Sequence, residues 1–161
     1  MTPQPKRLSA DDDLSPVLAL LNRAFAYMEG RIDPPSSLTR MTLDDLRSDA
    51  AGKELWVIPG EDLTPLACVI LTPKPDHLYI GKLAVNASAR GQGLSRILIN
   101  HAEDRARALG LPALQLQTRV ELADNHATFQ RMGFTQIGAT AHEGFDRPTS
   151  LTFARPVPEL S

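Results

Sequence analysis

The chain has 161 residues, a length typical of one domain with its own core, so residues 1–161 are predicted to form a single domain. Its net charge is −2 at pH 7 and it has no run of Lys or Arg, so charge does not indicate a nucleic-acid partner. No apolar run is long enough to cross a membrane and no signal peptide is visible, which predicts a cytoplasmic protein without a membrane partner. Cys68 is the only cysteine, so an intrachain disulfide is excluded, and its apolar neighbours predict that it is buried.

Apolar periodicity and Gly/Pro punctuation divide the chain into strands and helices. The elements expected in chain order are a strand at 6–10, helices at about 11–30 and 42–51, strands at 54–59, 66–71 and 77–85, a helix at 94–109, a strand at 113–120, a helix at 124–132, and strands at 134–140 and 150–155. Thr42 and Asp45 have the spacing of a capping box. The central strand–helix–strand unit implies parallel pairing, whereas the hairpin before it is antiparallel. The expected fold class is therefore α/β (α+β), a single mixed sheet of about six or seven strands with helices on both faces.

A glycine-containing loop, Arg90-Gly91-Gln92-Gly93-Leu94-Ser95, lies between the strand at 77–85 and the long helix. Glycine permits a tight turn and a close approach of the backbone to a ligand. The unpaired N–H groups of the first helical turn then favour an anion. By itself the pattern has two interpretations, a phosphate-binding loop or only a tight strand-to-helix connection.

With its flanking elements, this loop resembles the acyl-CoA pyrophosphate motif of the GNAT superfamily of acetyl-CoA-dependent N-acetyltransferases. That motif runs Arg/Gln-x-x-Gly-x-Gly/Ala; Arg90 and Gly93 match it, and Ser95 departs from its last position. The segment from Asn125 to Phe134 is similar to a later helix of the family, which ends in Gly-Phe. The resemblance covers the chain from about residue 6 to 155, and the polar loops resemble those of a bacterial branch.

The resemblance implies transfer of an acetyl group from acetyl-CoA to a primary amine of a small-molecule acceptor, by direct attack and without a metal. It places the backbone of residues 83–85 beside the pantetheine arm, with an N–H near Val85 polarising the thioester carbonyl. The residues it implies in binding acetyl-CoA are Leu83, Ala84, Val85, Arg90, Gly91, Gln92, Gly93, Leu94, Ser95, Arg96, Asn125 and Phe129. A non-catalytic acyl-CoA sensor and a protein N-terminal or lysine acetyltransferase remain as alternatives, and a homodimer remains open.

Two departures from the family pattern leave the proton-transfer groups undetermined. Phe129 stands where many members have a tyrosine proposed to protonate the CoA thiolate, and it has no hydroxyl. The strand before the glycine loop also lacks the glutamate that members often use as a base. By alternation Tyr79 and His77 share one face of that strand, so they are the catalytic candidates. The alternative is structural, with Tyr79 as a cross-strand aromatic and His77 as a solvated residue at the strand start. Lys82 would lie on the opposite face.

Two polar loops are expected on the acceptor side. Arg31 and Asp33 occur in a segment stiffened by prolines, and Glu143 and Asp146 occur between the last two strands. A carboxylate binds an ammonium and an arginine binds a carboxylate, so these four residues are the candidate acceptor-binding groups. The alternative is that both loops are solvated turns. The four histidines show no metal-ligand spacing, and His101 and His126, on predicted helices, are expected at the surface.

Overall fold

A computed structural model describes residues 4–26, 41–61 and 64–158. Within these ranges seven strands form one sheet in the order β1-β2-β3-β4-β5-β7-β6. The elements are β1 (Lys6–Leu8), α1 (Ser15–Ala26), α2 (Leu43–Gly52), β2 (Glu54–Pro59), β3 (Pro65–Pro73), β4 (Leu78–Val85), the 3₁₀ helix η3 (Ala87–Ala89), α3 (Leu94–Leu109), β5 (Ala113–Arg119), α4 (Ala123–Arg131), β6 (Thr135–Thr140) and β7 (Ser150–Pro156). None of the helices in the described ranges combines the length and the apolar character needed to cross a membrane.

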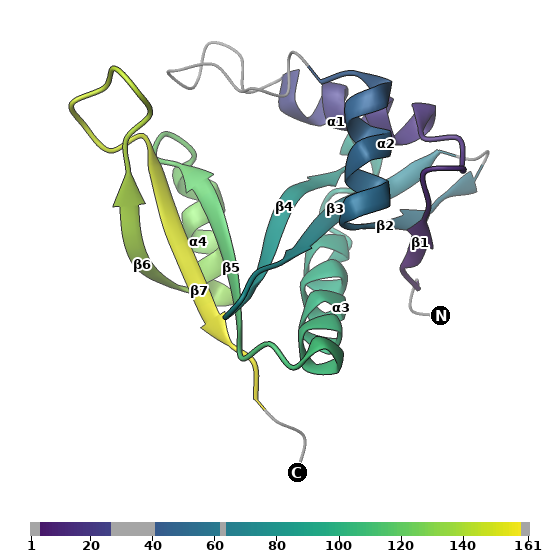
Figure 1. The fold of residues 1–161 in the computed structure, drawn as a ribbon. Coiled ribbons are helices and arrows are strands. Elements are labelled where there is room, and N and C mark those ends of the chain that lie inside the picture. The colour runs from purple at the N-terminus through teal and green to yellow at the C-terminus, as the bar shows by residue number, and fades with distance from the viewer. Residues whose placement is uncertain (1–3, 27–40, 62–63, 159–161) are drawn as a thin grey trace.

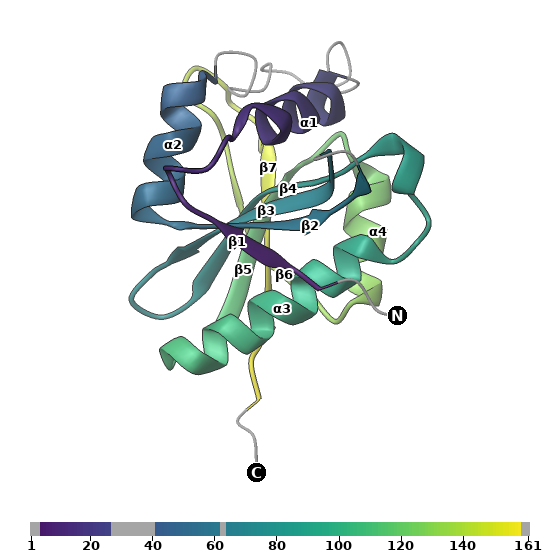
Figure 2. The same cartoon turned by 90° about the vertical axis from the view of Figure 1, so that its right-hand side faces the viewer.

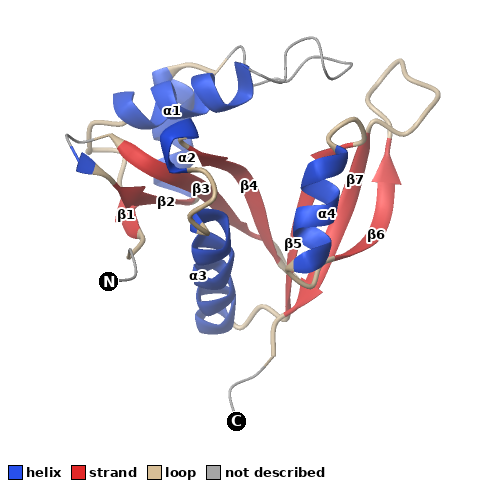
Figure 3. Ribbon diagram, turned by 180° about the vertical axis from the view of Figure 1, so that it is seen from behind, coloured by secondary structure: helices blue, strands red, loops and turns tan. Residues whose placement is uncertain are grey.

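The sheet is mixed, with helices on both of its faces (Figures 1 and 3). Strands β1 to β4 pair antiparallel in sequence, β4 pairs with β5 in parallel, and β5, β7 and β6 are again antiparallel. The parallel pair requires a crossover, which α3 provides. Helices α1 and α2 lie on one face, whereas α3 lies on the other (Figure 2). The expected fold class is confirmed.

Each face of the sheet has its own apolar core. The core under α3 and α4 joins alternate residues of the central strands, such as Leu78 and Ile80, to Leu98 of α3. The core under α1 and α2 contains Cys68, and burial raises the pKa of its thiol to about 12. Cys68 is thus a buried apolar residue, as its neighbours in the sequence predict.

Side-chain caps determine where the first two helices begin. Thr42 and Asp45 form the expected capping box at the start of α2. Helix α1 begins at Ser15, later than the acidic triplet suggests, because Asp13 accepts a hydrogen bond from the Ser15 N–H at 3.0 Å. The Asp12 carboxylate accepts one from the Ser9 N–H at 2.8 Å, and this turn also ends β1 earlier than expected. The end of this helix expected at residue 30 lies outside the described residues.

The expectation that two helical histidines lie at the surface is wrong. The His101 ring packs edge-on against Trp56 with ring centroids 4.1 Å apart, and its Nε2 is buried without a hydrogen-bond partner among the described residues. Burial lowers the pKa of His101, since the charged form loses its hydration. The His126 Nε2 lies 2.9 Å from the Arg119 carbonyl oxygen. An imidazole has apolar ring faces, so sequence polarity alone does not keep it in solvent.

Candidate active site

The central sheet opens between its two parallel strands (Figure 1). Pairing of β4 with β5 covers only residues 78–80 and 114–116, although both strands continue beyond these positions. In the described part of the chain, the edge of β4 that faces β5 has no strand partner past this point. Unpaired N–H and C=O groups along such an edge are able to bind an extended ligand that itself contains amides.

A β-bulge in β4 accompanies this opening. The register against β3 shifts so that Lys82 and Leu83 together oppose Val69. Lys82 has φ 50° and is the only non-glycine residue with a positive φ in the described ranges. The extra residue changes which face of the sheet the following side chains point to. Ile80, before the bulge, belongs to the core under α3, whereas Ala84, after it, belongs to the core under α1 and α2. A bulged strand bends and twists more strongly, which separates the end of β4 from its straight neighbour.

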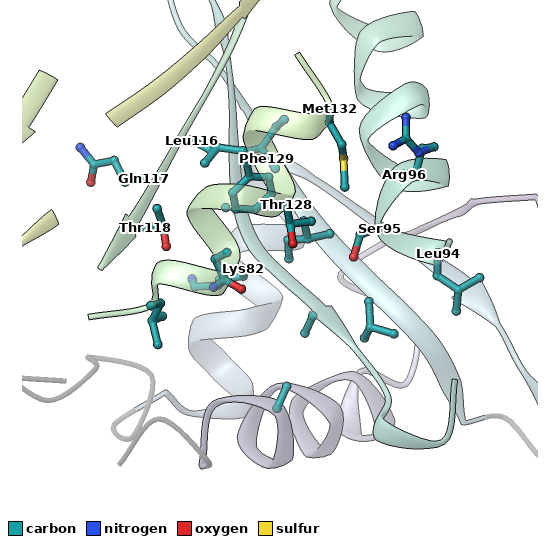
Figure 4. A pocket seen from close by; sticks show the side chains of 18 of the residues that line it. Lys82, Leu94, Ser95, Arg96, Leu116, Gln117, Thr118, Thr128, Phe129 and Met132 are labelled. Carbon is teal, nitrogen blue, oxygen red and sulfur yellow. The ribbon is translucent and has the colours of Figure 1, made fainter. Parts of the chain in front are cut away.

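A cleft of about 720 Å³ occupies the opening. Residues from the end of β4, the glycine loop, the first turn of α3, the end of β5 and α4 form its walls. Figure 4 shows Leu116 and Phe129 facing each other between β5 and α4, whereas Gln117 points to the other side of β5. The volume is in the range of small-molecule sites, about 300–1,000 Å³. The cleft therefore has room for a ligand that enters between the two strands.

The glycine loop presents the N-terminus of α3 to this cleft. Gly91 and Gly93 have φ 83° and 75°, values that glycine adopts at little cost. Gly93 is the N-cap of α3 and no side chain caps the helix there, so the N–H groups of the first turn remain available. Arg90 and Arg96 line the same end of the cleft. Backbone donors, the helix dipole and two guanidinium groups together suit a phosphate ester.

Most residues expected to bind acetyl-CoA are brought together at the cleft. All of those named for binding acetyl-CoA line it except Gln92, which is exposed. Asn125 and Phe129 reach the cleft from α4. The Phe129 ring packs edge-on against Phe134, with ring centroids 5.9 Å apart. Phe129 is thus a half-buried apolar wall of the cleft.

The two catalytic candidates on β4 have different positions. Tyr79 lines the cleft, where burial raises the pKa of its phenol and a hydrogen bond from the Gln117 backbone opposes that rise. His77 precedes β4 and does not line the cleft; its Nδ1 lies 2.7 Å from the carboxylate of Asp76. The structure brings Tyr79, and not His77, to the opening.

Lys82 lies on the same face of the sheet as Tyr79, and not on the opposite face that simple alternation predicts. Tyr79 points away from the core that contains Leu78 and Ile80, which places it on the α1 and α2 side of the sheet. The Lys82 ammonium lies on that same side, where its Nζ is 2.7 Å from a carboxylate oxygen of Asp49 in α2. One inserted residue at a positive φ is enough to turn this side chain to the other face.

The proposed acceptor loops are not part of the described cleft. Residues 31 and 33 lie outside the described residues. Glu143 and Asp146 are exposed in the loop between β6 and β7, and neither lines the cleft. Six polar residues that line the cleft are not among the candidates expected from the sequence: Lys82, Gln117, Thr118, Arg119, Thr128 and Ser150. The polar residues that alternate with Leu114 and Leu116 along β5 were a signal for Gln117 and Arg119, because a central strand covered on both faces is normally apolar on both.

Comparison with known proteins identifies the family. The sequence model of the Acetyltransferase (GNAT) family matches residues 16–134. The chain belongs to this family. It is 37% identical over 115 residues to an IAA acetyltransferase of Azospirillum brasilense, covering 70% of this chain and 74% of that one. It is 34% identical over 138 residues to a streptothricin acetyltransferase of Streptomyces lavendulae, covering 74% and 71%.

A solved structure has the same fold. PaiA N-acetyltransferase from Thermoplasma acidophilum, in complex with coenzyme A, superposes with a TM-score of 0.77 over 97% of this chain and 99% of that one, at 11% identity. The family match and the two sequence relatives make this GNAT chain an acyltransferase, of a family that uses acetyl-CoA. Its uncapped α3 N-terminus, cationic loop and unpaired β4 edge fit a ligand with phosphates at one end and amides along its length. The described residues contain no group of His, Cys, Asp and Glu side chains arranged to hold a metal ion.

Proposed function

We propose that this protein transfers the acetyl group of acetyl-CoA to a primary amine of a small-molecule acceptor. The observation that carries the proposal is the opening between β4 and β5, which is lined by residues from both faces of the sheet. Arg90 and the α3 N-terminus line it at one end, whereas Tyr79 and Lys82 line it from the α1 and α2 side. A thioester held in this opening is exposed to an acceptor that arrives from the face opposite α3.

The unpaired edge of β4 suits the amides of the pantetheine arm. In this arrangement the backbone of residues 83–85 pairs with the arm as a further strand would. The pyrophosphate then lies against the N–H groups that follow Gly93, with Arg90 and Arg96 beside it. The half-buried ring of Phe129 covers the apolar end of the arm from α4.

The acceptor has to arrive as a neutral amine. Among the described residues, no carboxylate and no imidazole lines the cleft. The amine nitrogen forms a bond to the thioester carbonyl carbon and loses a proton to solvent. The C–S bond breaks with its electron pair on sulfur, and the CoA thiolate leaves and takes up a proton from solvent. The raised pKa of Tyr79 keeps its hydroxyl protonated at neutral pH, so it is a donor rather than a base. We infer that the Tyr79 hydroxyl donates a hydrogen bond to the thioester as negative charge develops on the thioester.

Replacing Tyr79 with phenylalanine is expected to lower kcat by about ten- to a hundredfold while KM for acetyl-CoA stays nearly unchanged, because one transition-state donor is removed. His77→Gln, at the position just before β4 and outside the cleft, is the matched control, and its kcat should stay near that of the wild type. Steady-state kinetics at saturating acceptor measure both. If His77→Gln were the slower enzyme, the assignment of the donor to Tyr79 would be wrong.

A thiol-release assay with acetyl-CoA and a panel of primary amines tests the function itself. Free CoA should appear in proportion to the acetylated amine, and kcat/KM should rise with pH up to the pKa of each acceptor amine. Calorimetric binding of acetyl-CoA without turnover on any amine would favour an acyl-CoA sensor. Turnover confined to peptides with a free N-terminus or a lysine would favour a protein acetyltransferase. Absence of acetyl-CoA binding would overturn the proposal.

A further inference from the structure

The cleft has two cationic side chains beyond those at the phosphate end. Pairing between β4 and β5 ends at Ile80 and Leu116. Lys82 lies two residues beyond Ile80 on β4, and Arg119 lies three residues beyond Leu116 on β5. Both line the cleft. They therefore belong to its two diverging walls, one on each strand.

These two side chains lie on the acceptor side of the sheet. Lys82 reaches α2, which covers that face. Leu116 is buried in the core under α3, so alternation along β5 places Gln117 and Arg119 on the opposite face. Figure 4 shows Gln117 pointing to that side of β5. In the described part of the chain, the charged residues that line the cleft are Lys82, Arg90, Arg96 and Arg119, all of them cationic.

The Lys82 ammonium is held firmly in place. Its Nζ donates to Asp49 Oδ2 at 2.7 Å, while the other oxygen of that carboxylate lies 3.3 Å from Lys53 Nζ. A single carboxylate thus serves two ammonium groups, which leaves the cluster with a net positive charge. An ammonium has three N–H donors, and only one of them is directed at Asp49. The Cys68 thiol donates to the Lys82 carbonyl oxygen at 3.7 Å and supports the bulge from within the core.

A positive φ at a lysine is costly to maintain. Backbone strain of this kind costs on the order of 1–3 kcal/mol and is concentrated at functional sites. The bulge places a long cationic side chain at the point where β4 leaves β5, and a glycine would have formed the same bulge with less strain. A strained backbone at Lys82 therefore points to a function for its side chain.

We propose that Lys82, with Arg119 on the facing strand, binds an anionic group of the acceptor, so that the preferred acceptors are primary amines that carry a carboxylate or a phosphate. This inference rests on the proposed acetyltransferase function. An ammonium and a guanidinium make charge-assisted hydrogen bonds to either anion.

Matched pairs of amines test this substrate class. The pairs are γ-aminobutyrate with butylamine, and O-phosphoethanolamine with ethanolamine, because the members of each pair differ chiefly in the anionic group. The wild-type enzyme should show a kcat/KM at least about tenfold higher for the anionic member of one pair, the gain expected from a charge-assisted hydrogen bond. The pair that shows the larger preference distinguishes a carboxylate from a phosphate.

Three variants assign the preference to Lys82. Lys82→Met should lower kcat/KM for the anionic amine by about ten- to a hundredfold and leave the neutral amine nearly unchanged. Lys82→Arg should restore most of the preference, since the charge is kept. Lys53→Met is the matched control, because Lys53 shares the Asp49 carboxylate but does not line the cleft. Its preference should equal that of the wild type. Each variant is first titrated with acetyl-CoA to show that the fold and the CoA site are intact.

Two results would overturn the inference in distinguishable ways. Equal kcat/KM for the charged and neutral members of both pairs would overturn the anionic-acceptor assignment and leave the acetyltransferase function standing. An anionic preference that persists in Lys82→Met would show that another group recognises the anion. Lack of turnover on every amine, with acetyl-CoA bound, would overturn the proposed function instead.

Discussion

Replacing Gly93 with valine is expected to weaken acetyl-CoA binding by about 10- to 100-fold, the loss of one or two charge-assisted hydrogen bonds. Gly93 is the N-cap of α3 with φ 75° and ψ 19°, and a β-branched residue is a true outlier in this region. No atom lies within 4 Å of the position that a Cβ would occupy, so the obstacle is conformational and not steric. The backbone has to rotate to relieve the strain, and this rotation redirects the N–H groups of the first helical turn.

Gly110 offers a matched control at the other end of the same helix. It is the C-cap of α3 with φ 73° and ψ 24°, and it too has no atom within 4 Å of a Cβ position. Gly110→Val should therefore lower the free energy of unfolding much as Gly93→Val does, by about 1–2 kcal/mol, without affecting the cleft. Isothermal titration with acetyl-CoA and urea denaturation measure the two effects separately. Equal binding losses in both variants would mean that helix stability, and not the geometry of the loop, controls affinity.

The order of elements and the glycine loop could be predicted from the sequence because their signals are local. A capping box at Thr42, glycines at both ends of α3 and alternating apolar residues in the strands each constrain a few neighbouring residues. Gly91 and Gly93 mark positive φ values directly, since glycine is the default residue there. Local rules were sufficient for these features.

The shape of the opening could not be predicted in the same way. Lys82 has no local feature that predicts a positive φ, and the bulge reverses the side-chain alternation that places residues on a face. The contact that fixes its side chain is with Asp49, on a helix 33 positions earlier. The separation of Tyr79 from His77 also depends on where β4 begins and where the strands part. These are long-range properties of the sheet, so no pattern of neighbouring residues predicts them.

A buried ion pair away from the cleft couples the long helix to the outer part of the sheet. Glu54 on β2 is 5% exposed. Arg105 of α3 donates to its two carboxylate oxygens, each at 2.8 Å, and the Trp56 indole N–H donates to one of them at 3.0 Å. The hydrogen bonds from Arg105 lower the pKa of Glu54 most strongly, although burial acts in the opposite direction. The carboxylate is thus charged in an environment with little water.

Replacing Arg105 with methionine is expected to reduce the free energy of unfolding by about 2–3 kcal/mol at pH 7. Among the described residues, the change leaves the buried Glu54 carboxylate with the Trp56 indole N–H as its one side-chain donor. The value lies below the usual cost of breaking a buried pair because the Arg105 side chain is 27% exposed, so water replaces part of its interaction. The double variant Glu54→Met/Arg105→Met should recover most of the loss, since no unpaired charge remains. Urea denaturation of the wild type, both single variants and the double variant measures this cycle.

The same pair predicts a pH dependence with a definite sign. The pKa of Glu54 is lower in the folded protein than in the unfolded chain, so its contribution to stability is present above the unfolded value, about 4.3, and is lost as pH falls through the folded value. Removing Arg105 removes that contribution. The difference in unfolding free energy between the wild type and Arg105→Met should therefore be largest near neutral pH and should shrink in acid. A difference that stayed constant from pH 7 to acid would show that packing of the arginine side chain, and not its charge on Glu54, stabilises this contact.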